Sequence, residues 1–287
     1  MKDRNVRLRR ISELDPEKDY REITALFYLD FQAIMVLQAV TGNLMTFAVP
    51  RMSRILSATK QFENHTAKRM VDTTLLVQAV LDHGLGAGEG RDAARRVNAM
   101  HRQYDIHADD FVAVGCDVPI MSLEIADRFG WRPVTDAERE SLRIHYSAEA
   151  RAFGSHRPLP ETLPEMRAYW HAYLDENTAF EPQNRRLADA FLTFLPQLFP
   201  RPLRPFVSPI LLAQVDPRIL RACGLPEPSA RRKRISTRVM RALGRTGPAP
   251  DLEPGERNVI EKLAESLYPN GWTVHTLGTH VPSATQP

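Results

Sequence analysis

A histidine falls on the predicted buried face of a helix within the stretch RRVNAMHRQYDIHADDF, residues 95–111. Residues at i, i+3, i+4 and i+7 share one face of a helix. Here those residues are Val97, Met100, His101 and Tyr104. A buried neutral imidazole needs partners for its ring nitrogens, because an unpaired buried polar group costs about 1–3 kcal/mol. His101 is therefore either a hydrogen-bonded core histidine or a ligand of a metal or haem.

An arginine and a threonine form a second candidate pair. Arg69 and Thr73 lie four residues apart in a helix predicted over 66–83, so both project from one face, beside an apolar stripe. A guanidinium beside a core needs an anion. That anion is either a nearby acid of the protein, or a carboxylate of a cofactor or a bound oxygen species, with Thr73 donating a hydrogen bond.

Other polar combinations give weaker indications. His101 and His107 are six residues apart, whereas two ligands on one helix face need a spacing of four. His107 together with Asp109 and Asp110 could form a carboxylate site, but adjacent acids after a turn are more typical of helix caps. His145 lies in the middle of a predicted helix and is a candidate to face the same interior as His101.

Composition sets the class of protein. The chain has 287 residues, of which 43% are hydrophobic, and this is enough for a core that holds a cofactor. A net charge of +3 gives no whole-protein indication of nucleic-acid binding. The two cysteines, Cys116 and Cys223, match no disulfide or zinc pattern and fit a reducing compartment. GLGAGEG, residues 84–90, lacks the strand and the Lys-Ser/Thr pair of a phosphate loop, so we predict a flexible connector.

Hydrophobic periodicity predicts an all-α protein, because a period near 3.6 residues recurs in long windows and strand patterns are nearly absent. The predicted helices cover residues 17–46, 50–57, 66–83, 91–104, 109–130, 135–153, 162–176 and 183–198. Thr135 and Glu138 have capping-box spacing. A proline-rich connection follows over 198–217. We expect a single domain over 1–287, a helical bundle in which 246–257 links to a C-terminal closing segment, either a short strand or extended chain, over 268–282.

Two segments raise the question of membrane contact. Residues 23–50 are the most apolar, but Asp30 and Gln32 interrupt them, so we predict a buried helix, with a membrane span as the alternative. Residues 230–245 are basic and amphipathic. We expect a solvated face there, with peripheral contact to an anionic bilayer as the alternative. No signal-peptide pattern occurs, which favours a cytoplasmic protein, with membrane association as the alternative.

Five segments, taken in order, resemble bacterial members of the MpaB-type oxygenase family, whose superfamily includes the latex-clearing proteins. They are RMVDTTLLVQAVLDHG, RRVNAMHRQYDIHADDFVAV, RFGWRPVTDAERES, LPETLPEMRAY and LYPNGWTVHTLGTHVP. The resemblance runs from RRISELDPEKDYREI to LGTHVP. No single segment is diagnostic, but five in order are specific.

The resemblance implies a globin-like, all-helical fold around a haem b held by one histidine, which corresponds to His101. It also implies an enzyme that cleaves isoprenoid carbon–carbon double bonds with O₂. Arg69 and Thr73 match the Arg-x-x-x-Thr pair of the superfamily. Latex-clearing proteins tend to have a lysine just before that threonine, whereas this chain has Asp72, so a polymer substrate is not implied.

Three hypotheses follow. The first is a haem-b oxygenase in which His101 binds the iron, Arg69 and Thr73 act on the open side, and O₂ and a small lipophilic alkene react in an apolar cavity. We expect the walls to include Phe27, Phe31, Leu75 and Phe111, with His145 a candidate for the sixth iron position. The second is a non-catalytic haem or lipid carrier. The third is a helical interaction protein without a cofactor.

Overall fold

The structure, a computed structural model, describes residues 3–247 and 259–279, where every regular element is helical and no strand occurs. The prediction of an all-α protein is therefore confirmed. The helices are α1 (Val6–Ser12), α2 (Tyr20–Ala48), α3 (Pro50–Ala58), α4 (Gln61–His83), α5 (Gly88–His101), α6 (Ala108–Phe129), α7 (Asp136–Ala152), α8 (Leu163–Asn177), α9 (Pro182–Phe194), α10 (Arg204–Leu212), α11 (Pro217–Ala222), α12 (Ala230–Arg245) and α13 (Val259–Leu267), with short 3-10 turns η1 (Leu195–Leu198), η2 (Arg201–Leu203) and η3 (Val274–Thr276).

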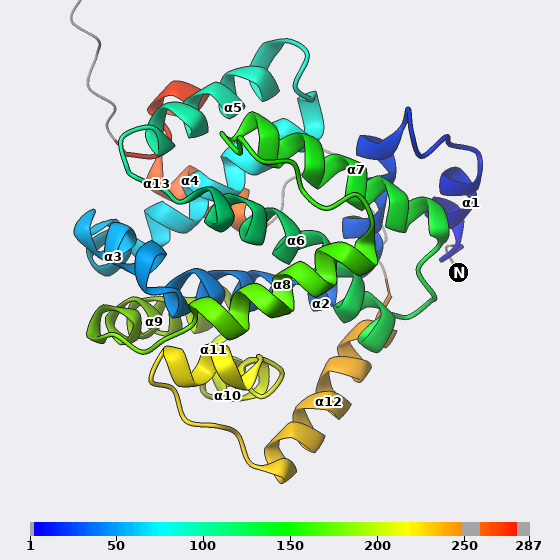
Figure 1. Cartoon of the computed structure of the whole chain (residues 1–287). Helices are drawn as coiled ribbons and strands as arrows, with labels where there is room; N and C mark the ends of the chain where they lie inside the picture. The colour runs from blue at the N-terminus through cyan, green and yellow to red at the C-terminus, as the bar shows by residue number, and fades with distance from the viewer. Residues whose placement is uncertain (1–2, 248–258, 280–287) are drawn as a thin grey trace, which may run out of the picture.

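Helix α2 is the centre of the molecule (Figure 1). It is a single helix of 29 residues that packs against α6 and α7 on one side and α9 and α11 on another. Its length and composition would allow it to cross a membrane, yet half of its most apolar 18-residue window is buried inside the fold. The packing agrees with the predicted buried helix, because its apolar side chains are covered by neighbouring helices.

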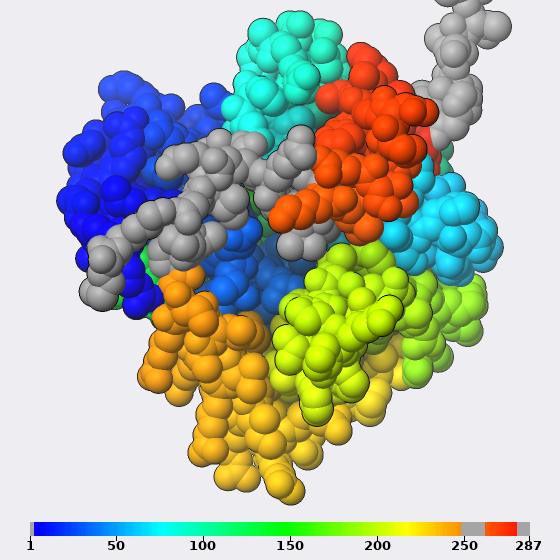
Figure 2. Space-filling view, turned by 180° about the vertical axis from the view of Figure 1, so that it is seen from behind, coloured from blue at the N-terminus to red at the C-terminus, as the bar shows by residue number. Residues whose placement is uncertain are grey.

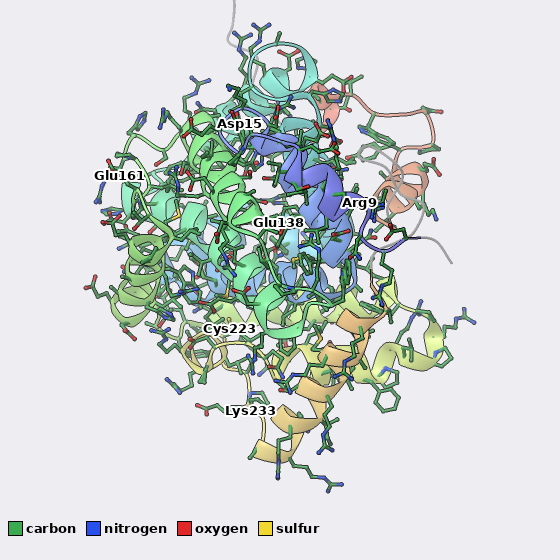
Figure 3. The ribbon with its side chains drawn as sticks, turned by 90° about the vertical axis from the view of Figure 1, so that its right-hand side faces the viewer. Arg9, Asp15, Glu138, Glu161, Cys223 and Lys233 are labelled. Carbon is green, nitrogen blue, oxygen red and sulfur yellow. The ribbon has the colours of Figure 1, made fainter. Side chains whose placement is uncertain are left out.

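A buried charge cluster holds α2 to the start of α7. Arg132 donates to Asp30 of α2 at 2.6 and 2.9 Å and to Glu138 of α7 at 2.6 and 2.9 Å. Glu138, labelled in Figure 3, also accepts from the backbone N–H of Thr135 and so completes the predicted capping box. The sequence predicted the capping box, but it did not predict that Arg132 would link Glu138 to Asp30 of α2.

Helix α4 begins earlier than predicted. It starts at Gln61, and its backbone is kinked at His65, where φ is −140° and ψ is 43°. The predicted start at Thr66 therefore marks the second half of a bent helix. Helix α5 begins inside the glycine-rich stretch, at Gly88, and ends at His101, three residues before the predicted end.

The C-terminal third is more helical than predicted. The proline-rich stretch 198–217 was expected to be a connection, but it forms η2 and α10, because a proline at the first turn of a helix loses no hydrogen bond. The sequence also did not predict α13. After α13 the chain forms η3 in place of a strand and buries Leu277, which is 1% exposed. Figure 2 shows this segment, orange to red, beside the cyan α4.

Most of the predicted linker over 246–257 lies outside the described residues, apart from Thr246 and Gly247. The domain limits, 1–287 with that linker, stay a prediction.

Candidate functional site

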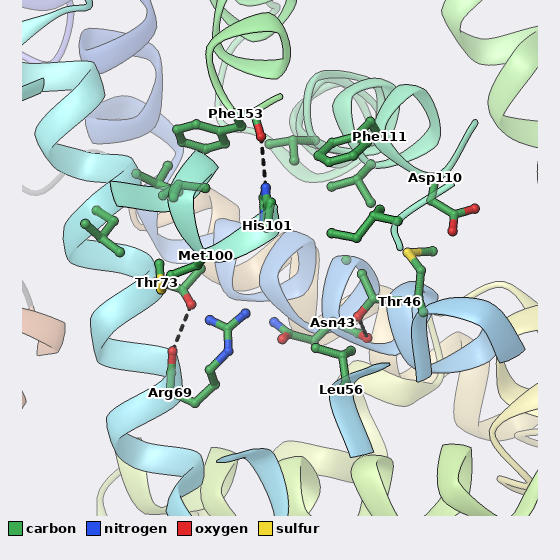
Figure 4. Close-up of a pocket in the computed structure, with 18 of the residues that line it drawn as sticks. Asn43, Thr46, Leu56, Arg69, Thr73, Met100, His101, Asp110, Phe111 and Phe153 are labelled. Atoms are coloured by element: carbon green, nitrogen blue, oxygen red, sulfur yellow. Dashed lines mark hydrogen bonds between the residues drawn. The ribbon is translucent and has the colours of Figure 1, made fainter. Parts of the chain in front are cut away.

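A cavity of about 510 Å³ lies between α2 to α7 and the C-terminal segment (Figure 4). Cavities of this size are typical of small-molecule sites. Its walls are mainly apolar, with polar groups at a few places. His101, Arg69 and Thr73, the three residues singled out from the sequence, all line it. Three residues from two helices are thus brought to one enclosed space.

His101 is the last residue of α5, and its imidazole has a fixed orientation. Its Nδ1 donates to the carbonyl oxygen of Phe153, the residue after α7, at 2.9 Å. Burial lowers the pKa of His101, and the nearby Arg69 lowers it further, so the ring is neutral. With the proton on Nδ1, Nε2 keeps its lone pair. The ring edge packs against Phe111, with 5.4 Å between the ring centroids. This is the tautomer that a metal-binding histidine needs.

Arg69 is a partly buried cation that has no carboxylate partner among the described residues. Figure 4 shows its guanidinium pointing into the cavity below His101, toward Asn43 on α2. In the parts of the chain that the structure describes, it makes no ion pair, and its recorded contact is with the ring of Phe62, 5.7 Å from the centroid. Burial lowers the pKa of Arg69, which shows that its charge is poorly solvated. The site therefore suits an anion.

Thr73 lies one helical turn after Arg69 on the same cavity wall. Its Oγ1 donates to the carbonyl oxygen of Arg69 at 2.9 Å. Because the hydroxyl proton is engaged in this hydrogen bond within α4, Oγ1 of Thr73 can only accept a hydrogen bond from a ligand. The sequence prediction had Thr73 as a donor, which would require the hydroxyl to rotate away from the helix.

Asp72 anchors the C-terminal segment. Its carboxylate accepts from Lys68, from the hydroxyl of Tyr268, and from the backbone N–H of Gly278 at 2.9 Å. Gly278 and the following Thr279 line the cavity. Asp72 thus holds part of the cavity wall in place, and Lys68 neutralises the charge of Asp72.

Two expectations about the cavity were wrong. His145 does not line it. Its Nε2 lies 3.7 Å from Oε2 of Glu149 and its ring is near Tyr20, so it is not placed to be a sixth iron ligand. Of the four residues predicted to form the walls, only Phe111 does so, because Phe27, Phe31 and Leu75 are buried in the packed core.

The alternative carboxylate site after α5 is occupied by capping and ion pairs. Nδ1 of His107 accepts from the N–H of Asp109 and caps α6, while the side chain of Asp109 pairs with Arg157. Asp110 pairs with Arg51 at 2.7 Å. Among the described residues, no group of three or more His, Cys, Asp or Glu side chains is arranged to hold a metal ion. His101 therefore belongs to no such group, but a haem needs only one histidine ligand.

Sequence reasoning missed several lining residues. Asn43 and Thr46 of α2 lie within the apolar stretch 23–50 and were not predicted as site residues, although both line the cavity. Asp117 and Glu149 also line it. A signal existed for Asp117, since it is the one acid inside the apolar run FVAVGCDVPIMSL. Nothing local marks Glu149.

The fold and the cavity define an all-helical protein with an enclosed apolar site for a small molecule. The family model described as "ER-bound oxygenase mpaB/B'/Rubber oxygenase, catalytic domain" matches residues 27–246. The chain belongs to this family, which makes it an oxidoreductase of the oxygenase class.

Two further likenesses were found. The structure of latex clearing protein in its closed state superposes with a TM-score of 0.57 at 17% identity, covering 88% of this chain and 73% of that one, which shows a shared fold. An isoleucine–tRNA ligase of Methanoregula boonei is 36% identical over 85 residues, or 28% of this chain. The match spans only 8% of the ligase, so the activity of the ligase is not carried over to this chain.

Proposed function

We propose that the protein is a haem-b-dependent oxygenase that uses O₂ to cleave a carbon–carbon double bond of a small lipophilic, isoprenoid-type alkene. The observation that supports this most is the combination of a neutral His101, whose Nδ1–H is bound to Phe153, with a partly buried Arg69 that forms no ion pair with any described acid. A neutral imidazole suits iron, and an uncompensated cation suits an acidic group of the cofactor.

The residues present fit a haem. His101 would supply Nε2 as the iron ligand, with Phe153 fixing the tautomer. Arg69 would pair with a haem propionate, because guanidinium binds carboxylates in two-pronged geometry. When bound, the haem supplies the redox chemistry with O₂. His101 is the one protein ligand that this requires, and no further histidine, cysteine or acid is needed.

The other side chains would bind and orient the substrate. Thr73 shares one wall with Arg69 and would lie beside the reacting part of the alkene. The mainly apolar lining desolvates a lipophilic chain and offers little to a sugar or phosphate. Gly278 and Thr279 close one side and keep bulk water out.

The first experiment is the ultraviolet–visible spectrum of purified protein, oxidised, reduced and with carbon monoxide. We expect a Soret band that shifts with carbon monoxide and that His101→Ala abolishes. His107→Ala is the matched control, because His107 caps α6 outside the cavity. A flat spectrum after haem reconstitution, or a band that survives in His101→Ala, would contradict the assignment.

Consumption of O₂ separates an oxygenase from a carrier on the same scaffold. We expect the reduced, haem-loaded protein to consume O₂ when an isoprenoid alkene is added, and to release carbonyl products. A protein with a normal haem spectrum that neither consumes O₂ nor forms products would be the carrier. A colourless protein that folds normally would favour the interaction protein without a cofactor.

We also propose that α12 contacts an anionic lipid surface. Seven basic residues lie on it: Arg231, Arg232, Lys233, Arg234, Arg238, Arg241 and Arg245. None of them forms an ion pair within the described chain. Lys233 marks this projecting helix in Figure 3, and the apolar Ile235 and Leu243 are also exposed. This combination is typical of helices that lie on acidic bilayers.

Co-sedimentation with phosphatidylserine vesicles tests this surface. We expect wild-type protein to bind these vesicles but not neutral ones, and a fourfold charge reversal at Arg231 to Arg234 to abolish binding. Reversal of the exposed Arg95 and Arg102 on another face is the control. Binding that survives the α12 reversal would contradict the proposal. Location in the cytoplasm stays a prediction, which cell fractionation would test.

A further inference from the structure

Two acids on one side of the cavity have no role in the proposed haem site. Asp117 of α6 is 2% exposed and Glu149 of α7 is 7% exposed, and both line the cavity. Buried acids are normally paired, because removal of a carboxyl group from water without a partner is costly. Their presence in an otherwise apolar wall calls for a partner.

In the described residues, the protein leaves part of each carboxyl group without a hydrogen bond. Oδ1 of Asp117 and Oε2 of Glu149 have no hydrogen-bond partner in the described residues. The indole N–H of Trp170 lies near Asp117 and lowers its pKa, but it too lacks a hydrogen bond of acceptable geometry. His145 is 3.7 Å from Glu149, outside hydrogen-bonding distance. An added donor would therefore stabilise both acids.

The two acids lie in one polar corner. A Cβ atom on Gly115 of α6 would lie 3.1 Å from Cβ of Ala150 of α7, so the parts of the two helices that carry Asp117 and Glu149 are in contact. Tyr28 of α2 brings a hydroxyl to Tyr146, one turn before Glu149 on α7. That hydroxyl is hydrogen-bonded to the hydroxyl of Tyr146 at 2.6 Å. Tyr146 itself lines the cavity. The corner therefore combines two acids with a pair of phenols.

The backbone of α2 approaches this corner closely. A Cβ atom on Gly42 would lie 3.0 Å from Oδ2 of Asp117 and 3.4 Å from Nε2 of Gln38. Glycine at this position leaves room for the carboxyl group, and Gln38 adds a polar group to the same wall. The corner has the features of a ligand subsite, because the glycine leaves space, polar side chains line it and apolar residues surround it.

We propose that Asp117 and Glu149 form a subsite for the hydroxyl group of the substrate, so that the lipophilic alkene is an alkenol. This rests on the proposed function for the reaction, but the binding step can be measured without it. A hydroxyl both donates and accepts, so it satisfies a carboxyl group in either protonation state. An ammonium donates hydrogen bonds but cannot accept one, so it suits the acids only when they are ionised, and a plain hydrocarbon would leave both acids unpaired.

The test compares ligands that differ only in the polar end. Geraniol, its methyl ether, geranylamine and the hydrocarbon 2,6-dimethylocta-2,6-diene would be titrated calorimetrically into haem-loaded and haem-free protein. We expect geraniol to bind at least tenfold more tightly than the ether, which accepts but cannot donate. Equal affinity of alcohol and ether would overturn the subsite, and tightest binding of the amine would replace it with a cation site.

Variants test whether the preference for the alcohol over the ether depends on Asp117 and Glu149. Asp117→Leu removes the acid and should bring the alcohol-to-ether ratio close to one, and Glu149→Gln should lower this ratio. Asp127→Asn, an exposed acid on the same helix, is the control and should leave the ratio unchanged. Gly42→Ala offers a second route, because it crowds Asp117 without removing it and suits a helix.

The two proposals fail separately. A normal haem spectrum with no alcohol preference would overturn the subsite alone. An alcohol preference that Asp117→Leu abolishes in haem-free protein, together with no haem binding, would support the subsite while the proposed reaction fails. A ratio unchanged in both Asp117→Leu and Gly42→Ala would overturn the assignment to this corner.

Discussion

Nδ1 of His101 lies 2.9 Å from the carbonyl oxygen of Phe153, so the end of α5 is fixed by the backbone at the end of α7. Because the acceptor is a main-chain atom, the tautomer of His101 depends on the local path of the chain and not on the side chain of Phe153. The residue that follows, Gly154, adopts a positive φ of 111°, a conformation that residues with a side chain rarely adopt.

Gly154→Ala should therefore weaken haem binding without touching the cavity. The added Cβ would strain the backbone and meet Oδ1 of Asn98 at 3.2 Å, which displaces the carbonyl that orients His101. Loss of such an orienting contact typically costs about tenfold to a hundredfold in metal affinity. Haem titration followed at the Soret band measures this. Gly86→Ala, which meets nothing within 4 Å, is the control and should bind haem normally.

Arg69→Met should have opposite effects on the stability of the haem-free protein and on haem binding. Burial already lowers the pKa of Arg69, and no described acid compensates its charge, so an apolar residue of similar length should raise the melting temperature of haem-free protein. The same change removes the proposed partner of a propionate and should reduce haem affinity. Differential scanning calorimetry and haem titration measure the two effects, with the exposed Arg95→Met as control. A lower melting temperature would show that the cation has a partner at rest.

Arg132→Met should destabilise the fold by about 3–5 kcal/mol, because it leaves the carboxylates of Asp30 and Glu138 buried without their shared cation. Arg139→Met, which breaks only the partly exposed pair with Asp127, should cost about 1 kcal/mol or less. Urea unfolding of both variants gives the comparison. Similar losses would indicate that the buried cluster is not a cross-link between α2 and α7.

Asp117→Asn should flatten the dependence of stability on pH. Burial raises the pKa of Asp117 from 3.8 to about 7, so between these values the folded protein holds a proton that the unfolded chain has lost. Stability from this group is therefore present below about pH 4, falls as the pH rises to about 7, and is constant above that. The difference in unfolding free energy between wild type and variant should fall by a few kcal/mol across this window. Urea unfolding at several pH values measures it, and a difference that rises with pH would contradict the assignment.

Much of the helical fold could be predicted because the information is local. Thr135 and Glu138 have capping-box spacing, and the structure contains that cap. The spacing of Arg69 and Thr73 placed them on one face, and both line the cavity. These features depend on residues within one or two turns of each other, which is the range over which sequence patterns carry physical meaning.

Other features depend on distant contacts. The acid that orients the C-terminal segment, Asp72, bonds to Gly278, 206 residues away. Helix α10 forms in a stretch whose prolines suggested a loop. Pro202 and Pro205 lie at helix starts, where a proline is tolerated, whereas Pro209 lies inside α10, a helix that packs into the core. The corner around Asp117 lies where α2, α6 and α7 are in contact, and no single segment of the sequence predicts that contact.

The late position of Gly278 and Thr279 in the chain also affects how the protein is made. During synthesis, α2 to α9 can pack as they leave the ribosome, but the cavity lacks part of its wall until the last described residues emerge and Asp72 receives the N–H of Gly278. Between these two events the nascent chain exposes an open, apolar cleft. That interval is the natural time for a bulky cofactor to enter, and it is also the stage at which the chain is most exposed to aggregation.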